Sequence, residues 1–275
     1  MSVFVVLVVI VIAILIVRGV LKSIDSKNKE KSSDYYRSAN EYQRNGNYEQ
    51  ALNDYNQAMQ LDNDPYYHNY RGRANIHCLL GNIDLAISDY TQAISKGKND
   101  LKRSEDIIKS GVSSLTSTHP DLCNIAEAYN LRGDMYDKKG DRIKAVEDYN
   151  EAIIQFNNTI QAGPYGPEYY AKRGDVYAKL GYNNKMLEDY NKAIWTCDKL
   201  LQNNKNDFEQ LHLRGRFNLR LGNIENAIAD LESIMKFKLS KGDYDDFEDY
   251  NYDVKKLREL QENVKKEIEE IKKIN

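Results

Sequence analysis

A spacing of small residues recurs along the chain and constrains its fold more than any other feature. Its clearest copy lies between residues 129 and 153, with successive offsets of seven, five, four and three residues. The members of this copy are Gly133, Gly140, Ala145, Tyr149 and Ala152. Small residues let two backbones approach closely, and a large ring fills the space beside them. The spacing therefore predicts a short helix, a tight turn and a second short helix.

The same spacing occurs five times, which indicates a repeated unit. The other copies are Ala39, Gly46, Ala51, Tyr55 and Ala58; Ala74, Gly81, Ala86, Tyr90 and Ala93; Gly174, Gly181, Met186, Tyr190 and Ala193; and Gly215, Gly222, Ala227, Leu231 and Ile234. A unit of about 34 residues with these landmarks resembles the tetratricopeptide repeat. The resemblance covers roughly residues 32 to 239. It implies an all-α fold, a solenoid of helix-turn-helix units, and identifies a scaffold rather than a chemistry.

The spacing of the turn glycines predicts about five unequal repeats. We expect these repeats near residues 32–65, 67–100, 126–160, 167–201 and 208–239. The intervals between the glycines are 35, 59, 41 and 41 residues. The longest interval predicts a helical insertion at 101–125, which either extends a helix or adds one, and His119-Pro120-Asp121 is expected to end it. The two 41-residue intervals predict second helices two turns longer than usual.

Residues 1–22 are strongly apolar. No polar side chain occurs from Val3 to Val17, and Val20 and Leu21 extend the run past Arg18. About 20 apolar residues span a bilayer core, and an arginine near the end can reach the interface. We therefore expect a transmembrane signal anchor that contacts the membrane through residues 3–21. A cleaved signal peptide is the alternative, but the sequence has no basic segment before Val3 and no Ala-x-Ala site.

The charges after the apolar run predict the orientation of this anchor. They are Arg18, Lys22, Lys27, Lys29 and Lys31. The positive-inside rule places the N-terminus outside and the repeats in the cytoplasm of a single-pass protein. Residues 23–33 are polar and lack apolar periodicity, so we expect a juxtamembrane linker. Its lysines either contact anionic headgroups or are solvated.

Residues 240–275 combine an acidic, aromatic segment with a charged helix that carries one apolar stripe. The stripe consists of Leu257, Leu260, Val264, Ile268, Ile271 and Ile274. The ends of a solenoid need a helix with one polar face, so we expect a C-terminal capping helix. Self-association through a coiled coil at 254–275 is the alternative. It is less favoured because only about three heptads are available and Glu267 interrupts them.

An arginine directly precedes the first small landmark in four repeats, and an aspartate follows it sixteen residues later. The pairs are Arg73 and Asp89, Arg132 and Asp148, Arg173 and Asp189, and Arg214 and Asp230. Repeat one has Ser38 and Asp54 at these positions. We expect structural ion pairs, within a unit or between neighbours. A residue that recognises one ligand would not be expected to recur in every unit.

Composition and motifs point away from catalysis and from nucleic acid. The net charge is −3, whereas a phosphate-binding face needs a clear basic excess. Four histidines and the cysteines Cys78, Cys123 and Cys197 are scattered, so we expect reduced thiols and no metal or cofactor site. Neither a phosphate-binding loop nor GxSxG occurs, and no catalytic residue can be named. The sequence predicts a protein that is not an enzyme.

In the family that the repeats resemble, the first helix of each unit lines a concave groove for a peptide or a partner helix. Helical spacing places the residues three before, one after and four after the first small landmark on that face. The candidate binding residues are Tyr36, Asn40, Arg71, Asn75, Asn130, Asp134, Asp137, Asp175, His212 and Arg216. The groove is acidic in repeats three and four, which favours a partner with a basic stretch.

Some members of that family clamp the C-terminal carboxylate of chaperones with lysine, asparagine and arginine side chains. This chain matches their pattern only in part. Arg71 and Asn75 resemble the first unit of the clamp. Leu131 and Glu168 occupy positions where asparagine and lysine are needed, which leaves only Lys172 in the third unit. The resemblance therefore implies groove binding without identifying the ligand as a chaperone tail.

Together these features predict a membrane-anchored protein–protein interaction scaffold or adaptor. The alternative is a receptor or accessory factor for protein targeting or translocation at a membrane, because the resembled family includes anchored receptors of that kind. An exported scaffold, a third alternative, requires a processed N-terminus.

Overall fold

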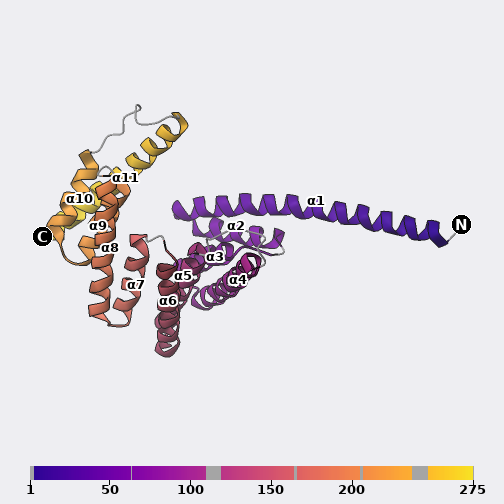
Figure 1. The fold of residues 1–275 in the computed structure, drawn as a ribbon, viewed down its shortest axis with the longest axis horizontal. Helices are drawn as coiled ribbons and strands as arrows, with labels where there is room; N and C mark the ends of the chain where they lie inside the picture. The colour runs from indigo at the N-terminus through magenta and orange to yellow at the C-terminus, as the bar shows by residue number, and fades with distance from the viewer. Residues whose placement is uncertain are drawn as a thin grey trace. The chain divides into compact units, whose positions relative to one another are not determined.

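The computed structural model describes residues 3–62, 64–109, 119–163, 166–204, 207–236 and 247–274. These residues form eleven α-helices and no strand, so this part of the chain has the expected all-helical, tetratricopeptide-like fold (Figure 1). The chain divides into two compact units, residues 1–152 and 153–275.

The first unit is built from helices that pack against their neighbours in the sequence. They are α1 (Val3–Arg44), α2 (Tyr48–Leu61), α3 (Tyr67–Leu79), α4 (Ile83–Lys109), α5 (His119–Lys138) and the start of α6 (Arg142–Ala162). α1 packs on α2, α3 on α4, and α4 on α5. One core cluster of the described residues consists of Ala39, Ala51, Tyr55 and Ile76, and another consists of Ala74, Ala86, Tyr90 and Met135. Most of these are the landmark residues of the sequence.

The second unit continues the same arrangement. After the end of α6 it contains α7 (Pro167–Lys179), α8 (Asn183–Asn203), α9 (Phe208–Arg220), α10 (Ile224–Lys236) and α11 (Phe247–Ile274). Ala171, Tyr190, Ala193, Cys197 and Phe217 form one core cluster. As expected from the longer glycine intervals, α6 and α8 each have 21 residues, whereas α2 has 14 and α10 has 13.

The turn glycines end the first helix of each unit in a left-handed conformation. Gly140 has a φ of +85°, which a residue with a Cβ rarely adopts. The backbone N–H of Asp141 then donates to the Tyr136 carbonyl at 2.9 Å, so a helix-end carbonyl is satisfied. Glycine is required here because it reverses the chain while keeping the helix end hydrogen-bonded.

α11 packs against the helices of repeat five, and its role as a cap stays a prediction. Leu257, Val264 and Ile268 are buried against Leu231 and Ile234. Leu260 and Ile271 pack against the same cluster, whereas the side chain of Ile274 and residues 240–246 lie outside the described part. The apolar stripe that could have formed a dimer seam is thus engaged within the chain.

Residues 23–33 differ from the expected linker because they belong to α1. The sequence from Val20 to Asn45 has no glycine or proline, so nothing interrupts the helix. Ser32 is 3% exposed, and its hydroxyl donates to the Ala58 carbonyl at 2.8 Å, so this segment already packs on α2. Polarity alone did not reveal this packing.

The insertion at 101–125 also differs from its expected ending. α4 is extended to Lys109, residues 110–118 lie outside the described part, and α5 begins at His119. His119-Pro120-Asp121 therefore starts a helix, where it was expected to end one. Proline is compatible with the first turn of a helix because the N–H that it lacks would have no intrahelical acceptor there.

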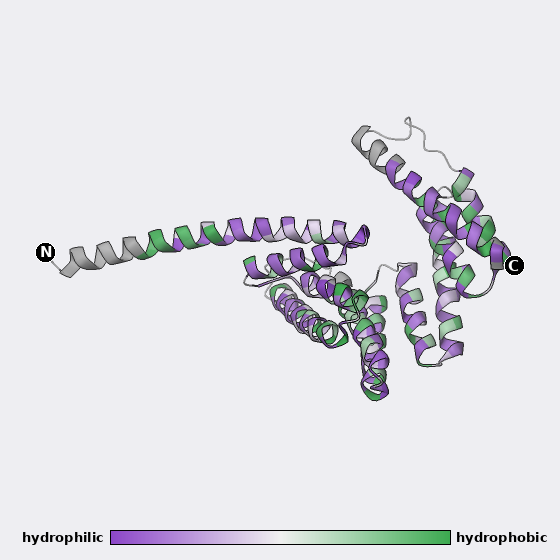
Figure 2. Ribbon diagram, turned by 180° about the vertical axis from the view of Figure 1, so that it is seen from behind, coloured by the Kyte–Doolittle hydropathy of each residue, from purple (hydrophilic) through white to green (hydrophobic). Residues whose placement is uncertain are grey.

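Among the residues whose side chains the structure describes, no helix is both long and apolar enough to cross a membrane. The side chains of residues 1–13, which make up most of the apolar run, lie outside that set. In Figure 2 the described apolar turns of α1 are green and the following turns are mostly purple. The anchor at residues 1–22 has no support from the structure and stays a prediction.

Candidate functional site

The four recurring arginines lie against the aspartates sixteen residues further on. Each donates from Nε and Nη2 to both carboxylate oxygens, at 2.7 and 2.7 Å in repeat two and at 2.8 and 2.7 Å in repeat three. The distances are 2.8 and 2.6 Å in repeat four and 3.0 and 2.5 Å in repeat five. The aspartates Asp89, Asp148, Asp189 and Asp230 are 2–6% exposed. This fork geometry fixes the register of the two helices.

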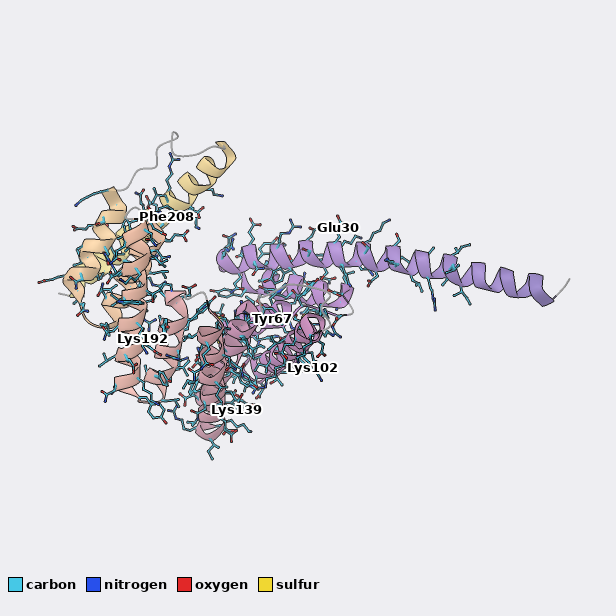
Figure 3. The ribbon with its side chains drawn as sticks, in the orientation of Figure 1. Glu30, Tyr67, Lys102, Lys139, Lys192 and Phe208 are labelled. Carbon is cyan, nitrogen blue, oxygen red and sulfur yellow. The ribbon has the colours of Figure 1, made fainter. Side chains whose placement is uncertain are left out.

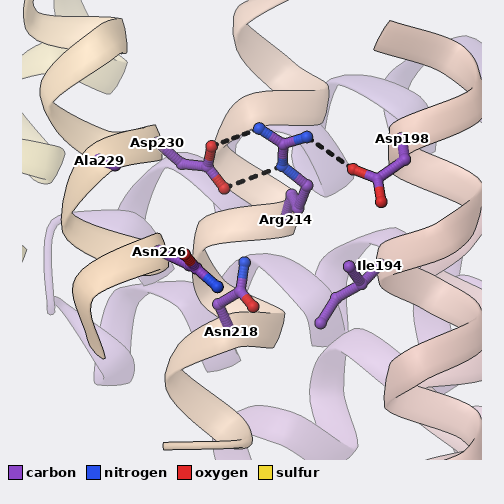
Figure 4. Close-up of a pocket in the computed structure, with 7 residues that line it drawn as sticks. All are labelled: Ile194, Asp198, Arg214, Asn218, Asn226, Ala229 and Asp230. Atoms are coloured by element: carbon purple, nitrogen blue, oxygen red, sulfur yellow. Dashed lines mark hydrogen bonds and ion pairs between the residues drawn. The ribbon is translucent and has the colours of Figure 1, made fainter. Parts of the chain in front are cut away.

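The remaining nitrogen of each guanidinium contacts the preceding repeat. Nη1 donates to an acceptor on the second helix before it, at 2.5 to 2.9 Å. The acceptors are Asn56, Thr91, Asn157 and Asp198. Figure 4 shows this arrangement around Arg214, which lies between Asp230 and Asp198 in a hollow of about 330 Å³. One arginine side chain thus links the two helices of its own repeat and links that repeat to the preceding one.

Three of these arginines are held charged by their partners. Hydrogen bonds to Asp230, and then to Asp198, raise the pKa of Arg214 against the opposing effect of burial. For Arg132 and Arg173, burial disfavours the charged form, but the hydrogen bonds to Asp148 and Asp189 outweigh it and raise the pKa. Since every nitrogen is used within the fold, the arginine row is structural.

A second recurring contact was missed at the level of the sequence. The hydroxyl of each second-helix tyrosine donates to the residue directly after the first small landmark. The contacts are Tyr55 to Asn40 at 3.1 Å, Tyr90 to Asn75 at 2.6 Å, Tyr149 to Asp134 at 2.8 Å, and Tyr190 to Asp175. The recurrence of Asn or Asp fifteen residues before each tyrosine was the available signal.

This contact gives Asn40, Asn75, Asp134 and Asp175 a role in the packing of their own repeats. Burial raises the pKa of all four tyrosines, and for Tyr149 and Tyr190 the hydrogen bond to a carboxylate raises it further. In repeat five Arg216 and Leu231 occupy these two positions, so the contact is absent there. Arg216 is therefore the candidate at this position that the tyrosine contact does not engage.

In the first unit, other candidate groove residues are also engaged within the chain. Arg71 Nη1 donates to Glu127 at 2.5 Å and to Asn124 at 3.3 Å, which links α3 to α5. Asp137 accepts from Arg142 at 2.9 Å. The ring of Tyr36 lies 4.7 Å from that of His68, and Asn130 is half-buried on α5. Arg71 is thus held toward α5 through its Nη1, which two side chains of that helix engage.

In the second unit, α7 and α9 form a hollow of about 240 Å³ at the expected groove positions. Its apolar part consists of Ala171, Leu213 and Phe217. Lys172, Arg216 and Arg220 supply positive charge, and Glu168 and Asp175 supply negative charge. We call this set the α7–α9 hollow. His212 does not line it and lies 3.4 Å from Glu267 on α11.

Pairing changes the charge that the α7–α9 hollow presents. Arg220 Nη1 donates to Asp175 at 2.6 Å, so these two charges compensate each other. Arg216 is exposed and forms no hydrogen bond or ion pair with a described residue. The hollow therefore combines an apolar floor with an excess of positive charge, to which the exposed Arg216 guanidinium contributes. Such a combination suits a segment that places an apolar and an acidic side chain together.

No group of three or more His, Cys, Asp or Glu side chains that could hold a metal ion occurs in the described part of the chain. Cys123 and Cys197 are buried, and Cys78 is partly exposed. Burial raises the pKa of Cys197 to about 12, so this thiol is not a nucleophile at neutral pH.

Comparison with known proteins supports the repeat architecture. Models of the tetratricopeptide repeat match residues 32–65, 126–153 and 167–194. No curated protein sequence matches the chain significantly.

Several solved structures are similar in fold at low sequence identity. A thermophilic tetratricopeptide repeat protein of Thermus thermophilus is 17% identical, with 85% of this chain and 98% of that chain covered and a TM-score of 0.47. MamA is 18% identical, with coverages of 68% and 89% and a TM-score of 0.40. YrrB, described as a repeat protein with an unusual peptide-binding site, is 16% identical, with coverages of 77% and 88% and a TM-score of 0.37.

Proposed function

We propose that the chain is a non-catalytic interaction scaffold that binds a segment of a partner protein in the α7–α9 hollow. The observation that carries this proposal is the exposed Arg216 beside the buried Phe217, which is 7% exposed. Both residues come from α9, while Ala171 and Lys172 face the same hollow from α7. Residues from two adjacent repeats therefore line one cavity, as a groove ligand requires.

The charge of the partner follows from which groups are already paired. The sequence favoured a basic segment, because repeats three and four carry several acids. In the structure Glu127 accepts from Arg71, Asp137 from Arg142, and Asp175 from Arg220. Besides the Asp175–Arg220 pair, the α7–α9 hollow contains Glu168, Lys172 and Arg216, so positive charge is in excess there. We therefore favour a partner segment with a carboxylate at this position, flanked by an apolar side chain.

The proposed test is capture of partners by the full-length protein in its native host. The protein carries a C-terminal tag and is crosslinked before purification of the membrane fraction. Arg216→Glu reverses the charge at the hollow. Lys192→Glu makes the same change on α8, outside the hollow, where Lys192 is labelled in Figure 3. Partners lost with Arg216→Glu and kept with Lys192→Glu support the assignment, whereas partners kept with both variants overturn it.

We further propose that residues 1–22 anchor the scaffold in a membrane, with the N-terminus outside and the repeats in the cytoplasm. The support is the uninterrupted apolar sequence and the five positive charges that follow it. An anchor of this kind raises the effective concentration of a bound partner at the membrane surface. Extraction with alkaline carbonate tests it: the full chain should stay in the membrane pellet, and a chain that is released contradicts the anchor.

The receptor for protein targeting or translocation remains the alternative function. The two functions differ in what the scaffold holds. Stable, stoichiometric recovery of one partner in the capture experiment favours an adaptor, whereas recovery of many precursor segments favours a receptor.

A further inference from the structure

A second hollow, of about 430 Å³, lies in the first unit where α1 runs beside the start of α3. Tyr36, Tyr66 and His68 form its aromatic wall, and we call it the aromatic hollow. The rings of Tyr66 and His68 stack with centroids 5.3 Å apart and 8° between their planes. Glu30 and Tyr67, labelled in Figure 3, mark the two helices. The wall offers ring faces, which attract organic cations.

The interior of the aromatic hollow carries two acceptors without adequate partners. Asn69 is 3% exposed, and its Oδ1 has no hydrogen-bond partner among the residues that the structure describes. Asp62 is 4% exposed, and its Oδ1 accepts the N–H of Asp64 at 3.1 Å. No ion pair to Asp62 is formed by the described residues. A buried acceptor without a donor and a buried carboxylate without a counter-charge are both unfavourable.

Two cations lie nearby, Lys29, which lines the aromatic hollow, and Lys96, which does not. Lys29 lies 3.5 Å from Asp25, and Lys96 pairs with Asp64 and Asp100 at 2.7 and 3.1 Å. Glu30 adds a negative charge to the lining. The lining therefore contains two carboxylates, Glu30 and Asp62, and one ammonium group, Lys29, which also lies near the exposed Asp25, so negative charge is in excess.

We propose that the aromatic hollow binds an organic cation with N–H donors, an alkylammonium or a guanidinium group. The N–H groups donate to Asn69 Oδ1 and to the Asp62 carboxylate, and the charge lies against the ring faces of Tyr36 and Tyr66. This site is separate from the α7–α9 hollow and does not depend on it. It goes beyond the proposed function by adding a second ligand class.

The helical geometry of α1 restricts the source of this cation. Lys29 and Tyr36 lie eight and fifteen residues after Leu21, which corresponds to about 12 and 22 Å along the helix. With the proposed anchor in place, the aromatic hollow lies beyond a headgroup layer roughly 5–8 Å thick. A soluble polyamine, or a lysine or arginine side chain of a partner, is therefore favoured over a lipid headgroup.

The experiment is calorimetric titration of the full-length protein in detergent micelles. The probes are spermidine, capped lysine and capped arginine peptides, and tetramethylammonium, a cation that has no N–H donor. We expect saturable binding of at least one donor-bearing probe and weaker binding of tetramethylammonium by about tenfold or more. The best-binding probe identifies the source as a free amine or a peptide side chain.

Variants test the assignment residue by residue. Asp62→Asn and Asn69→Leu should each weaken binding by about tenfold or more, because the first removes the negative charge that faces the cation and the second removes an acceptor for its N–H groups. Tyr66→Ala should weaken it by about threefold through loss of one ring face. Asp64→Asn is the matched control, because Asp64 is an exposed acid two residues from Asp62 that does not line the hollow.

Three results overturn the proposal. The first is the absence of saturable binding by the wild-type chain, and the second is equal weakening by Asp62→Asn and Asp64→Asn. The third is tetramethylammonium binding as tightly as the best donor-bearing probe. If the two buried variants do not fold, Tyr66→Ala decides, since Tyr66 is 60% exposed and its loss leaves the core intact. Unchanged binding by Tyr66→Ala then counts against the site.

Discussion

Arg173 holds Asp189 through two parallel hydrogen bonds, Nε to Oδ2 at 2.8 Å and Nη2 to Oδ1 at 2.6 Å, while its Nη1 donates to Asn157. The carboxylate is on α8, in the same repeat as the arginine, and the amide is on α6, in the preceding one. A single guanidinium therefore sets both the register of one hairpin and its stacking on the next.

Removing one member of this pair should be costly. Asp189→Ala leaves the guanidinium of Arg173 partly buried without its counter-charge, and we expect a loss of about 3–5 kcal/mol in unfolding free energy. Glu188→Ala removes the partner of Lys192 in an exposed pair, so its cost should be within about 1 kcal/mol. Urea denaturation followed by circular dichroism measures both. Replacing the pair together, as Arg173→Met with Asp189→Leu, should recover most of the loss, and equal effects of the two single variants would contradict this account.

Two glycines in equivalent positions should respond in opposite directions to alanine. A Cβ on Gly133 would lie 2.7 Å from the ring of Tyr149, which is buried and hydrogen-bonded, so Gly133→Ala should cost about 1–3 kcal/mol. A Cβ on Gly174 would meet its nearest atom at 3.4 Å, an ordinary contact. Gly174→Ala should be neutral or stabilising by up to about 1 kcal/mol, because alanine favours the helix. Thermal unfolding of both variants makes the comparison, and a similar Tm decrease in both would show that the difference in space is unimportant.

The buried tyrosines should make the fold sensitive to alkali. Burial raises the pKa of Tyr90 above its ordinary value of 10.0, so folding favours the protonated phenol. The stability from this group is fully present below about pH 10 and is lost as the pH rises through the folded-state pKa. We expect the urea midpoint to fall above pH 10, with a smaller pH-dependent fall in Tyr90→Phe. Tyr66→Phe is the control because Tyr66 is 60% exposed, and it should leave the pH dependence unchanged.

The three thiols should react at different rates. Cys78 is partly exposed, whereas Cys123 and Cys197 are 6% and 0% exposed. A maleimide should therefore label Cys78 in the folded protein and the other two only after denaturation. Burial raises the pKa of Cys197 to about 12, which further suppresses its thiolate at pH 7. Mass spectrometry of peptides from native and denatured samples gives the order of labelling, and early modification of Cys197 would argue against its buried position.

The parts of the fold that could be predicted from the sequence are those set by local spacing. Gly140 marks a turn because its positive φ disfavours any residue with a Cβ, and the buried Ala145 marks a close helix contact because a larger side chain lacks room there. Both requirements are visible in the order of residues. The interval between turn glycines sets how many residues the second helix can contain, so the extra length of α6 and α8 could also be predicted. The arginine–aspartate spacing of sixteen residues likewise reflects one fixed crossing of two helices.

The predictions from the sequence were wrong where a residue is compatible with two structural positions and only tertiary contacts determine which one it takes. Pro120 is compatible with a position after a helix or in the first turn of one, and no neighbouring residue distinguishes the two. Asp175 occupies a groove position, yet its carboxylate accepts from both Tyr190 and Arg220. Which groove charges stay uncompensated, and so the character of the α7–α9 hollow, depends on such partners across helices.

The continuity of α1 from Val3 to Arg44 has a mechanical consequence. One helix runs from the apolar segment into repeat one. A rotation or displacement of its start is therefore expected to rotate or displace repeat one as well. Each residue inserted near Ser26 would turn the first repeat by about 100° and move it by about 1.5 Å along the axis. The direction in which the aromatic hollow faces, relative to the apolar segment, is therefore set by the number of residues between Leu21 and Ser32.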